Sequence, residues 1–224
     1  VNANQTALVA ALTQEDPHAI FMAGDNTYSV SSSCSTIEAS QIAFDPWIQK
    51  CSIFRCGGNH DYDVEPQLAC SNLLYDYLPG NKRYYSKYFK HTGLELFVLS
   101  DGANTGGVLT EPDGNTVGSI QWEWFTAAIA ASQAKYKVVM WHKPLFSQLE
   151  ILSTICGLTT QPQLDWMYEL YGVDLVINGH NHCNVHHEME GVHYVQCAMP
   201  VRPAKQLRSD SDDAFCVFQL AGSG

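Results

Sequence analysis

The fold of this chain is decided by the stretch Ala19-Ile20-Phe21-Met22-Ala23-Gly24-Asp25. Its apolar residues predict a buried strand, and the Gly-Asp pair ends that strand with a turn that carries a carboxylate. A strand followed at once by a polar side chain is what an α/β protein needs at the carboxyl edge of a parallel sheet, where such proteins bind their ligands. The stretch therefore predicts an α/β fold and a first candidate site residue, Asp25.

Further strands with polar residues directly behind them follow along the chain. They are Ser52–Cys56 before Gly57-Gly58-Asn59-His60, Leu94–Leu99 before Ser100-Asp101, Lys137–Trp141 before His142, and Asp174–Ile177 before Asn178-Gly179-His180-Asn181-His182. Alternation of such strands with helical segments is typical of a layered α/β protein.

Helices and closing strands complete the predicted domain. Apolar residues at helical spacing predict helices over Gln5–Leu12 and Ser119–Ala134, and the second begins with a capping-box-like sequence. Val192–Ala198 and Ala214–Leu220 are predicted as closing strands of a second sheet. Since the chain contains no repeat and no linker, we expect a single domain over residues 1–224.

Composition and charge exclude some classes of partner. Twelve basic and 23 acidic residues give a net charge of −11, and so acidic a surface repels nucleic-acid backbones, so we expect no nucleic-acid partner. An anionic substrate would need local cations, for which metal ions are the natural source. No apolar run is long enough to span a bilayer, so we expect no membrane span. The oligomeric state stays open.

The cysteines indicate the compartment. Eight of them are dispersed along the chain without a Cys-x-x-Cys pair, which argues against a zinc ribbon or a thioredoxin-like site. Such a set favours disulfides in an oxidising compartment, with buried thiols of a cytosolic protein as the alternative. Asn4-Gln5-Thr6 fits a glycosylation acceptor. We therefore expect a secreted, extracellular, disulfide-bonded glycoprotein whose leader segment precedes Val1.

Metal-binding residue types recur behind the predicted strands. They are Asp25, Asn59, His60, His142, His180 and His182. Any one of them alone is better explained as a turn residue or a hydrogen-bonded core residue. Together, carboxylate, amide and imidazole groups at the same edge of one sheet predict a site for zinc, iron or manganese.

In chain order the motifs read Gly24-Asp25-Asn26-Thr27-Tyr28, Gly58-Asn59-His60-Asp61, His142-Lys143-Pro144 and Gly179-His180-Asn181-His182. This series resembles the signature of the calcineurin-like metallophosphoesterases, and Tyr28 resembles the purple acid phosphatase branch. Segments outside the motifs, such as Leu78–Tyr85 and Glu111–Thr116, resemble secreted microbial members, so the resemblance covers nearly the whole chain. It implies a four-layer α/β/β/α sandwich of two mixed sheets flanked by helices.

The resemblance also implies a role for each matching residue. Asp25 would bridge two metal ions, and Tyr28 and His182 would bind the first of them. The second ion would be bound by Asn59, His142 and His180. The implied pair is iron with zinc, manganese or iron, and a phenolate from Tyr28 favours ferric iron, although a dizinc site stays open.

Two other histidines have implied roles outside the metal shell. His60 would be a catalytic residue that stabilises or protonates the departing oxygen, and the alternative is a hydrogen-bonded turn residue held by Asp61. His186 is a weaker candidate for substrate binding, and a solvated loop is the alternative.

The implied activity is hydrolysis of phosphate monoesters by a metal-activated hydroxide at a dinuclear site. The family's first motif, Asp-x-Gly or Asp-x-His on a strand before the first helix, is not found in this sequence, and we expect that it precedes Val1. Two alternatives stay open. One is a catalytically weak or inactive phosphatase-like structural or binding module. The other is a phosphodiesterase whose specificity lies in loops such as Ser29–Ser40 and Gln148–Gln161.

Overall fold

The computed structural model describes residues 14–26, 52–64, 77–145, 166–181 and 184–197. The predicted helix over Gln5–Leu12, the predicted strand over Ala214–Leu220 and the two proposed specificity loops lie outside these residues.

The described elements alternate between strands and helices. In chain order they are β1 (Ala19–Met22), β2 (Ser52–Arg55), α4 (Asn59–Val64), β3 (Tyr85–Phe89), β4 (Leu94–Val98), α6 (Ile120–Ala131), β5 (Tyr136–Met140), the 3₁₀ helix η3 (Tyr168–Tyr171), β6 (Leu175–Asn178), β7 (Val185–Met189) and β8 (Val192–Gln196). All of the predicted strands within the described residues are confirmed to within about two residues at each end. Strands β3 and β7 and the short helix α4 were not predicted.

The strands form two sheets. β1 and β2 pair in parallel, and the second sheet has six strands in the order β3-β4-β5-β6-β8-β7. Within it the four inner strands are parallel, whereas β3 and β7 pair antiparallel at the two edges. The prediction that the candidate ligands share the edge of one sheet is therefore wrong. Asp25 and Asn59 follow strands of the small sheet, and His142 and His180 follow strands of the large one.

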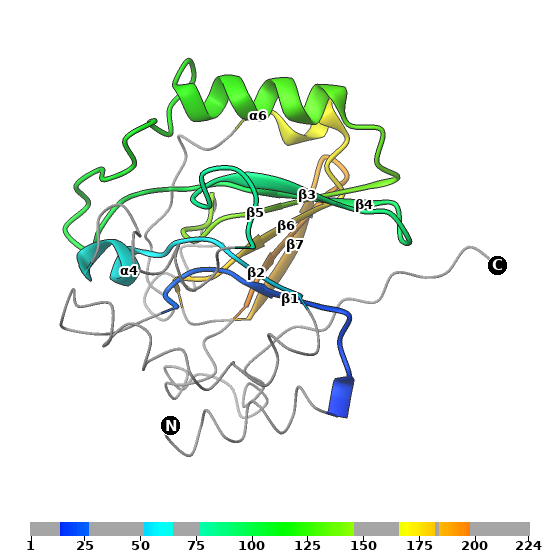
Figure 1. The fold of residues 1–224 in the computed structure, drawn as a ribbon, viewed down its shortest axis with the longest axis horizontal. Coiled ribbons are helices and arrows are strands. Elements are labelled where there is room, and N and C mark those ends of the chain that lie inside the picture. The colour runs from blue at the N-terminus through cyan, green and yellow to red at the C-terminus, as the bar shows by residue number, and fades with distance from the viewer. Residues whose placement is uncertain (1–13, 27–51, 65–76, 146–165, 182–183, 198–224) are drawn as a thin grey trace.

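The large sheet packs against different neighbours on its two faces (Figure 1). Phe54 of β2 packs with Leu96 and Met140 in a core that lies between the two sheets. On the other face, Phe97 packs with Phe125 of α6 in a second core. Leu96 and Phe97 are adjacent in β4 and point to opposite faces, as the strand period of two requires. The arrangement confirms the predicted sandwich of stacked sheets with helical cover.

Helix α6 confirms the predicted helix, with its ends moved inward from Ser119–Ala134. Ser119 is the N-cap, and its hydroxyl accepts a hydrogen bond from Trp122 N at 3.2 Å. The residues that α6 buries are Gln121, Phe125 and Ile129, which share one face at a spacing of four. Gln121 joins the helix to the end of β4, because its amide accepts from Ser100 N at 2.7 Å and donates to Ser100 O at 2.9 Å.

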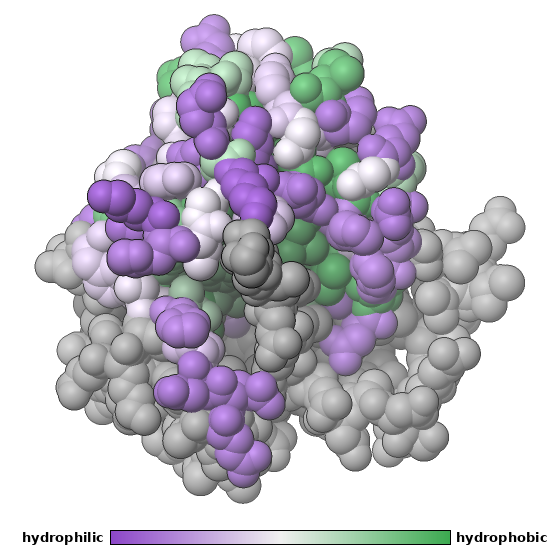
Figure 2. Space-filling model, turned by 90° about the vertical axis from the view of Figure 1, so that its right-hand side faces the viewer, coloured by the Kyte–Doolittle hydropathy of each residue, from purple (hydrophilic) through white to green (hydrophobic). Residues whose placement is uncertain are grey.

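Polar residues cover most of the described surface in the view of Figure 2, and hydrophobic residues show between them in small groups. Among the described residues, none of the helices has the length and hydropathy that crossing a bilayer requires.

Cys56 fits the alternative interpretation of the cysteines, a buried thiol, rather than the predicted disulfides. It lies at the end of β2 as a fully buried free thiol, and its Sγ donates to Met22 O at 3.7 Å. Burial raises the pKa of this thiol, with Asp101 and Asp61 adding to the effect, so it stays protonated and behaves as a core residue. Disulfides elsewhere in the chain remain a prediction.

Candidate metal centre

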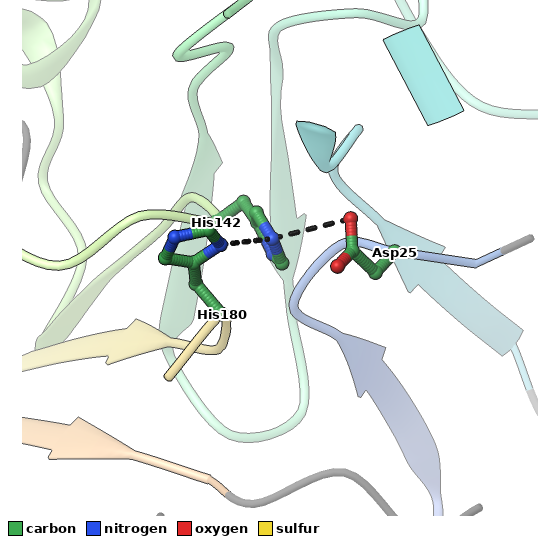
Figure 3. Close-up of side chains that lie close together, drawn as sticks. All are labelled: Asp25, His142 and His180. Atoms are coloured by element: carbon green, nitrogen blue, oxygen red, sulfur yellow. Dashed lines mark hydrogen bonds and ion pairs between the residues drawn. The ribbon is translucent and has the colours of Figure 1, made fainter. Parts of the chain in front are cut away.

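Polar turns from both sheets meet at one place. Asp25 follows β1, Asn59 begins α4 directly behind β2, His142 follows β5 and His180 follows β6. Figure 3 shows His142 lying between Asp25 and His180, with the three side chains directed toward one another. Among the described residues, Asp25, His142 and His180 form a group whose candidate ligand atoms all lie within 4.8 Å of one another.

The Nε2 atom of His142 is the centre of this cluster. It lies 3.2 Å from Asp25 Oδ1, 3.1 Å from Asn59 Oδ1 and 3.2 Å from His180 Nδ1. The other ring nitrogen, Nδ1, lies 2.7 Å from Ala23 O. Because a carbonyl oxygen only accepts, Nδ1 carries a proton, and a neutral His142 presents the lone pair of Nε2 to the cluster.

The cluster therefore has an excess of acceptors. In a neutral His142, a nitrogen lone pair faces a carboxylate oxygen and an amide oxygen with no hydrogen between them, which is repulsive in a buried site. Either a proton on Nε2 or a cation at the same place removes this repulsion.

The pKa values of Asp25 and His142 are shifted by burial and by the attraction between the two groups. Burial alone would raise the pKa of Asp25, but the charge of His142 and the hydrogen bonds from His142 and the His60 backbone bring it well below its ordinary 3.8. Burial alone would lower the pKa of His142, but Asp25, with help from Asp101, raises it from 6.5 to about 9. A proton on His142 thus takes the position that a metal ion would otherwise fill.

Two glycines allow the loops to come this close. Gly24 has φ +87°, a left-handed conformation, and a Cβ there would lie 2.3 Å from His142 Nδ1. A Cβ on Gly58 would lie 2.1 Å from Asp25 N and 2.3 Å from Asp25 Oδ1. Glycine is therefore needed in both motifs. Gly24 lets the turn behind β1 approach His142, and Gly58 lets the turn behind β2 approach Asp25.

Asp25 and His180 themselves adopt left-handed backbone conformations, with φ of 53° and 71°. Such conformations are uncommon for residues with a side chain and concentrate at functional sites. The turn of His180 is bound to that of His142, because Gly179 N donates to His142 O at 3.0 Å.

His60 lies beside the cluster rather than in it. Its backbone N donates to Asp25 Oδ1 at 3.0 Å, whereas its half-exposed imidazole has Nδ1 at 3.5 Å from Asp63 Oδ2. Asp61 Oδ2 accepts from Gly58 N at 2.9 Å and from Asn26 N at 3.1 Å, which fixes the turn behind β2 against the turn behind β1.

The remaining predicted residues divide into two groups. Tyr28 and His182 lie outside the described residues. His186 lies on β7, where its Nε2 is 3.1 Å from Nδ1 of His193 on the neighbouring strand β8. It is not a member of the cluster around His142, and its proposed contact with substrate remains a prediction.

Thr105 also contacts this cluster, and no pattern in the sequence pointed to it. Its Oγ1 accepts a hydrogen bond from Asn59 Nδ2 at 2.9 Å. It lies 46 positions away in an ordinary polar loop behind β4, and only the folded arrangement relates the two.

The residues present fit a metal centre. One carboxylate oxygen, one amide oxygen and two imidazole nitrogens are the donor types that zinc, iron and manganese accept. His142 is oriented for this by the bond from its Nδ1 to Ala23 O, the usual arrangement for an imidazole that binds a metal through its other nitrogen.

Comparisons with known proteins agree with this geometry. The calcineurin-like phosphoesterase family matches residues 2–184, whereas no curated protein sequence matches the chain. A purple acid phosphatase from yellow lupin (Lupinus luteus) seeds, PPD1, has a similar structure with a TM-score of 0.63 and 16% sequence identity. The similarity covers 86% of this chain and 38% of the lupin protein, so this chain spans well under half of that protein's length.

Two further solved structures share the fold at low identity. One is GAP50, described as the anchor in the inner membrane complex of Plasmodium, with a TM-score of 0.60, 12% identity and coverage of 94% of this chain and 72% of that one. The other is PhoD, with a TM-score of 0.54, 11% identity and coverage of 88% and 53%. With Asp25, Asn59, His142 and His180 together at one site and the family matching residues 2–184, this chain belongs to the calcineurin-like phosphoesterase family.

Proposed function

We propose that this protein hydrolyses phosphate monoesters at a dinuclear metal centre built around Asp25. The observation that carries the proposal is the convergence of Asp25 Oδ1, Asn59 Oδ1 and His180 Nδ1 on His142 Nε2, all at 3.1–3.2 Å. A buried cluster with so many acceptors is suited to a cation, and the family acts on phosphate esters.

Each residue of the cluster has a proposed part in holding the metals. Asn59, His142 and His180 would bind one ion, Tyr28 and His182 the other, and Asp25 has a second carboxylate oxygen with which to bridge them. When bound, two such ions lower the pKa of water and neutralise the charge of a transferring phosphoryl group. An overall charge of −11 makes this local positive charge necessary, because the rest of the protein repels a phosphate ester.

His60 is proposed to act on the leaving group. Its backbone is fixed by the bond to Asp25, while its ring is half-exposed at the edge of the cluster and is therefore accessible to a substrate. An imidazole in that place can donate a hydrogen bond or a proton to the oxygen that departs.

The monoester specificity, the acid phosphatase-like character and the metal pair are the finer parts of the proposal. They are supported by the Gly-Asp-x-x-Tyr spacing that places Tyr28 after Asp25 and by the fold shared with the lupin purple acid phosphatase. We propose iron together with zinc, manganese or a second iron, and a secreted, extracellular protein.

The test is metal content and turnover of p-nitrophenyl phosphate and bis-p-nitrophenyl phosphate by the purified chain, with His180→Asn and His91→Asn compared. His91 is exposed in the turn between β3 and β4, so His91→Asn should leave both readouts unchanged. His180→Asn should lower metal content and turnover together, by about a hundredfold or more in turnover.

The outcomes separate the candidate functions. A preference for the diester would identify a phosphodiesterase, and a visible absorption band would identify iron beside a tyrosinate. Metal binding without turnover of either ester would point to the alternative, a structural or binding module on this fold. A wild-type chain that binds no metal would refute the proposal.

A further inference from the structure

We propose that Thr105 is a positioning residue that orients the side-chain amide of Asn59 toward the metal centre, and that Asp63 fixes the hydroxyl of Thr105 for this purpose. The inference rests on the proposed metal centre. It concerns residues outside the four motifs, and it assigns a role to the loop behind β4.

The direction of each hydrogen bond follows from elementary chemistry. The hydroxyl of Thr105 donates its single proton to Asp63 Oδ2, because a carboxylate can only accept. Toward Asn59 the same oxygen must then accept, and it receives Nδ2–H at 2.9 Å. With Nδ2 directed to Thr105, the other end of the amide, Oδ1, is directed to His142 Nε2 at 3.1 Å.

Orientation matters here because the two ends of an amide have opposite chemistry. With Oδ1 toward the cluster, Asn59 offers a lone pair to a cation. If the amide turned over, its NH₂ group would face His142 Nε2 and would satisfy the acceptors of the cluster without a metal. The turned amide would thus compete with metal binding, and the bond to Thr105 disfavours it.

Thr105 is held firmly enough to do this. Its backbone N also donates to Asp63, to Oδ1 at 2.8 Å, so that the carboxylate binds both the backbone and the side chain of one residue. The same Asp63 Oδ2 lies 3.5 Å from the ring of His60, so the carboxylate also lies beside the proposed acid.

The loop that carries Thr105 is anchored at its base. Ala103 and Leu109 form an isolated antiparallel bridge, which closes a short hairpin over residues 103–109. Lys143, the neighbour of His142, donates its backbone N to Asp101 Oδ2 at 2.8 Å and its buried Nζ to Ala103 O at 3.2 Å. The loop is therefore attached to the turn that carries a proposed ligand.

The experiment compares Thr105→Val with Thr105→Ser in the purified full chain after removal of metals. Valine keeps the shape and loses the hydroxyl, whereas serine keeps the hydroxyl. Binding of Zn²⁺ and of Mn²⁺ is measured by competition with a chelator, a readout that does not depend on turnover. Thr105→Val should lower the affinity for one of the two metal ions by about 10–100-fold, which is the usual effect of removing a hydrogen-bond partner of a metal ligand. Thr105→Ser should bind both ions with wild-type affinity.

A matched control is Thr110→Val, in the same loop. The hydroxyl of Thr110 donates to Gly102 O at 2.6 Å, so this change removes a bond of the loop without touching Asn59. It should leave the affinity unchanged. Equal losses in Thr110→Val and Thr105→Val would show that loosening of the loop is responsible and would overturn the inference.

Asp63→Ala provides a second variant that does not alter Thr105. Asp63→Ala should also lower the metal affinity. The double variant with Thr105→Val should bind metal as tightly as Thr105→Val alone, because both changes remove the same chain of hydrogen bonds to Asn59. Wild-type affinity in Thr105→Val would overturn this inference alone. A wild-type chain without metal affinity would overturn the proposed function as well.

Discussion

Two polar clusters in this protein, the metal centre and the cluster around Arg83, differ in how their hydrogen-bond donors and acceptors are matched. At the metal centre, Asp25 and Asn59 direct acceptor oxygens at His142 Nε2, a nitrogen that is itself an acceptor when the ring is neutral. In the cluster around Arg83, every recorded contact joins a donor to an acceptor. Arg83 Nε donates to both oxygens of Glu111 at 3.2 Å, and its NH2 nitrogen donates to Asp113 at 2.8 Å.

This difference in donor–acceptor matching distinguishes a structural cluster from a binding site. Around Arg83 the charges are complementary, and Tyr84 completes the set by donating its hydroxyl to Asp113 at 2.9 Å, so the cluster joins β3 to the loop before α6 without any ligand. At the metal centre the oxygens of Asp25 and Asn59 face His142 Nε2, which can donate to them only when it carries a proton. Complementary polar groups indicate structure, whereas convergent acceptors indicate a place for a cation.

The largest expected effect tests the metal side of this comparison. Asp25→Asn keeps the shape of the side chain and removes its charge, so the centre loses its only carboxylate among the described ligands. We expect phosphate-ester turnover to fall by about a thousandfold, since removing one partner of a buried charge pair costs about 3–5 kcal/mol. The measurement is steady-state turnover alongside metal content. Unchanged values of both would break the distinction between the two clusters.

Arg83→Met tests the other side. It leaves the fully buried side chain of Glu111 without its partner, so we expect the free energy of unfolding to fall by about 3–5 kcal/mol. Metal affinity should be unchanged, because Arg83 is no part of the centre. Urea denaturation followed by circular dichroism gives the first quantity and chelator competition the second. A loss of metal affinity at full stability would contradict the structural role.

The pH dependence of the metal-free protein sharpens the comparison further. The pKa of His142 is about 9 in the folded state against an ordinary 6.5, so the folded protein holds more protons between these values than the unfolded chain. The stabilisation is complete below about pH 6.5 and is lost as the pH rises through about 9, for a total of about 3 kcal/mol.

Thermal unfolding of chelated protein between pH 6 and pH 10 measures this loss. The same series with metal present should not show the fall, because the cation then replaces the proton on Nε2. A flat profile in the chelated protein would mean that His142 is neutral there and that the acceptors are matched in some other way.

The smallest expected effect concerns the approach of the two loops. A Cβ at Gly58 would collide with Asp25, so Gly58→Ala should displace the turn and lower stability by about 1–3 kcal/mol, together with metal affinity. Gly106→Ala is the control, since a Cβ there meets only Asn104 Oδ1 at 3.4 Å. Equal melting temperatures for the two variants would show that the approach at Gly58 is not tight.

Most of the fold within the described residues could be predicted from the sequence, for a physical reason. β2, β4, β5 and β6 are largely buried and β1 is partly buried against them, and burial of both strand faces leaves a continuous apolar run that is easily recognised. The edge strands β3 and β7 were missed because they are partly exposed and read Tyr-Ser-Lys-Tyr-Phe and Val-His-His-Glu-Met. Two sheets were predicted, but the strands were assigned to them wrongly, since an apolar run does not state which strand it will pair with: β1 and β2 form a sheet apart from β4, β5 and β6, and β8 joins the sheet of β6.

The candidate site was predictable where ligand types directly follow strands. Asp25, Asn59, His142 and His180 were identified in this way, and the structure brings all four together. Thr105 was not identified, because nothing in its neighbourhood differs from an ordinary turn. Its contact with Asn59 depends on how the loop behind β4 lies against α4, and this information is stored in long-range packing rather than in a local pattern.

The origin of the ligands from two different sheets has a thermodynamic consequence. A cation bound to Asp25 and His142 would bridge the β1–β2 pair and the six-stranded sheet. The two sheets also contact each other through apolar side chains such as Phe54 and Met140 and through the hydrogen bond from Tyr85 Oη to Arg55 O at 2.8 Å. Metal binding would then strengthen the association of the two sheets, and association of the sheets would strengthen metal binding by the same free energy. A substitution in the apolar layer that loosens the two sheets, however far from the ligands, will weaken metal binding by up to the factor by which the metal strengthens their association.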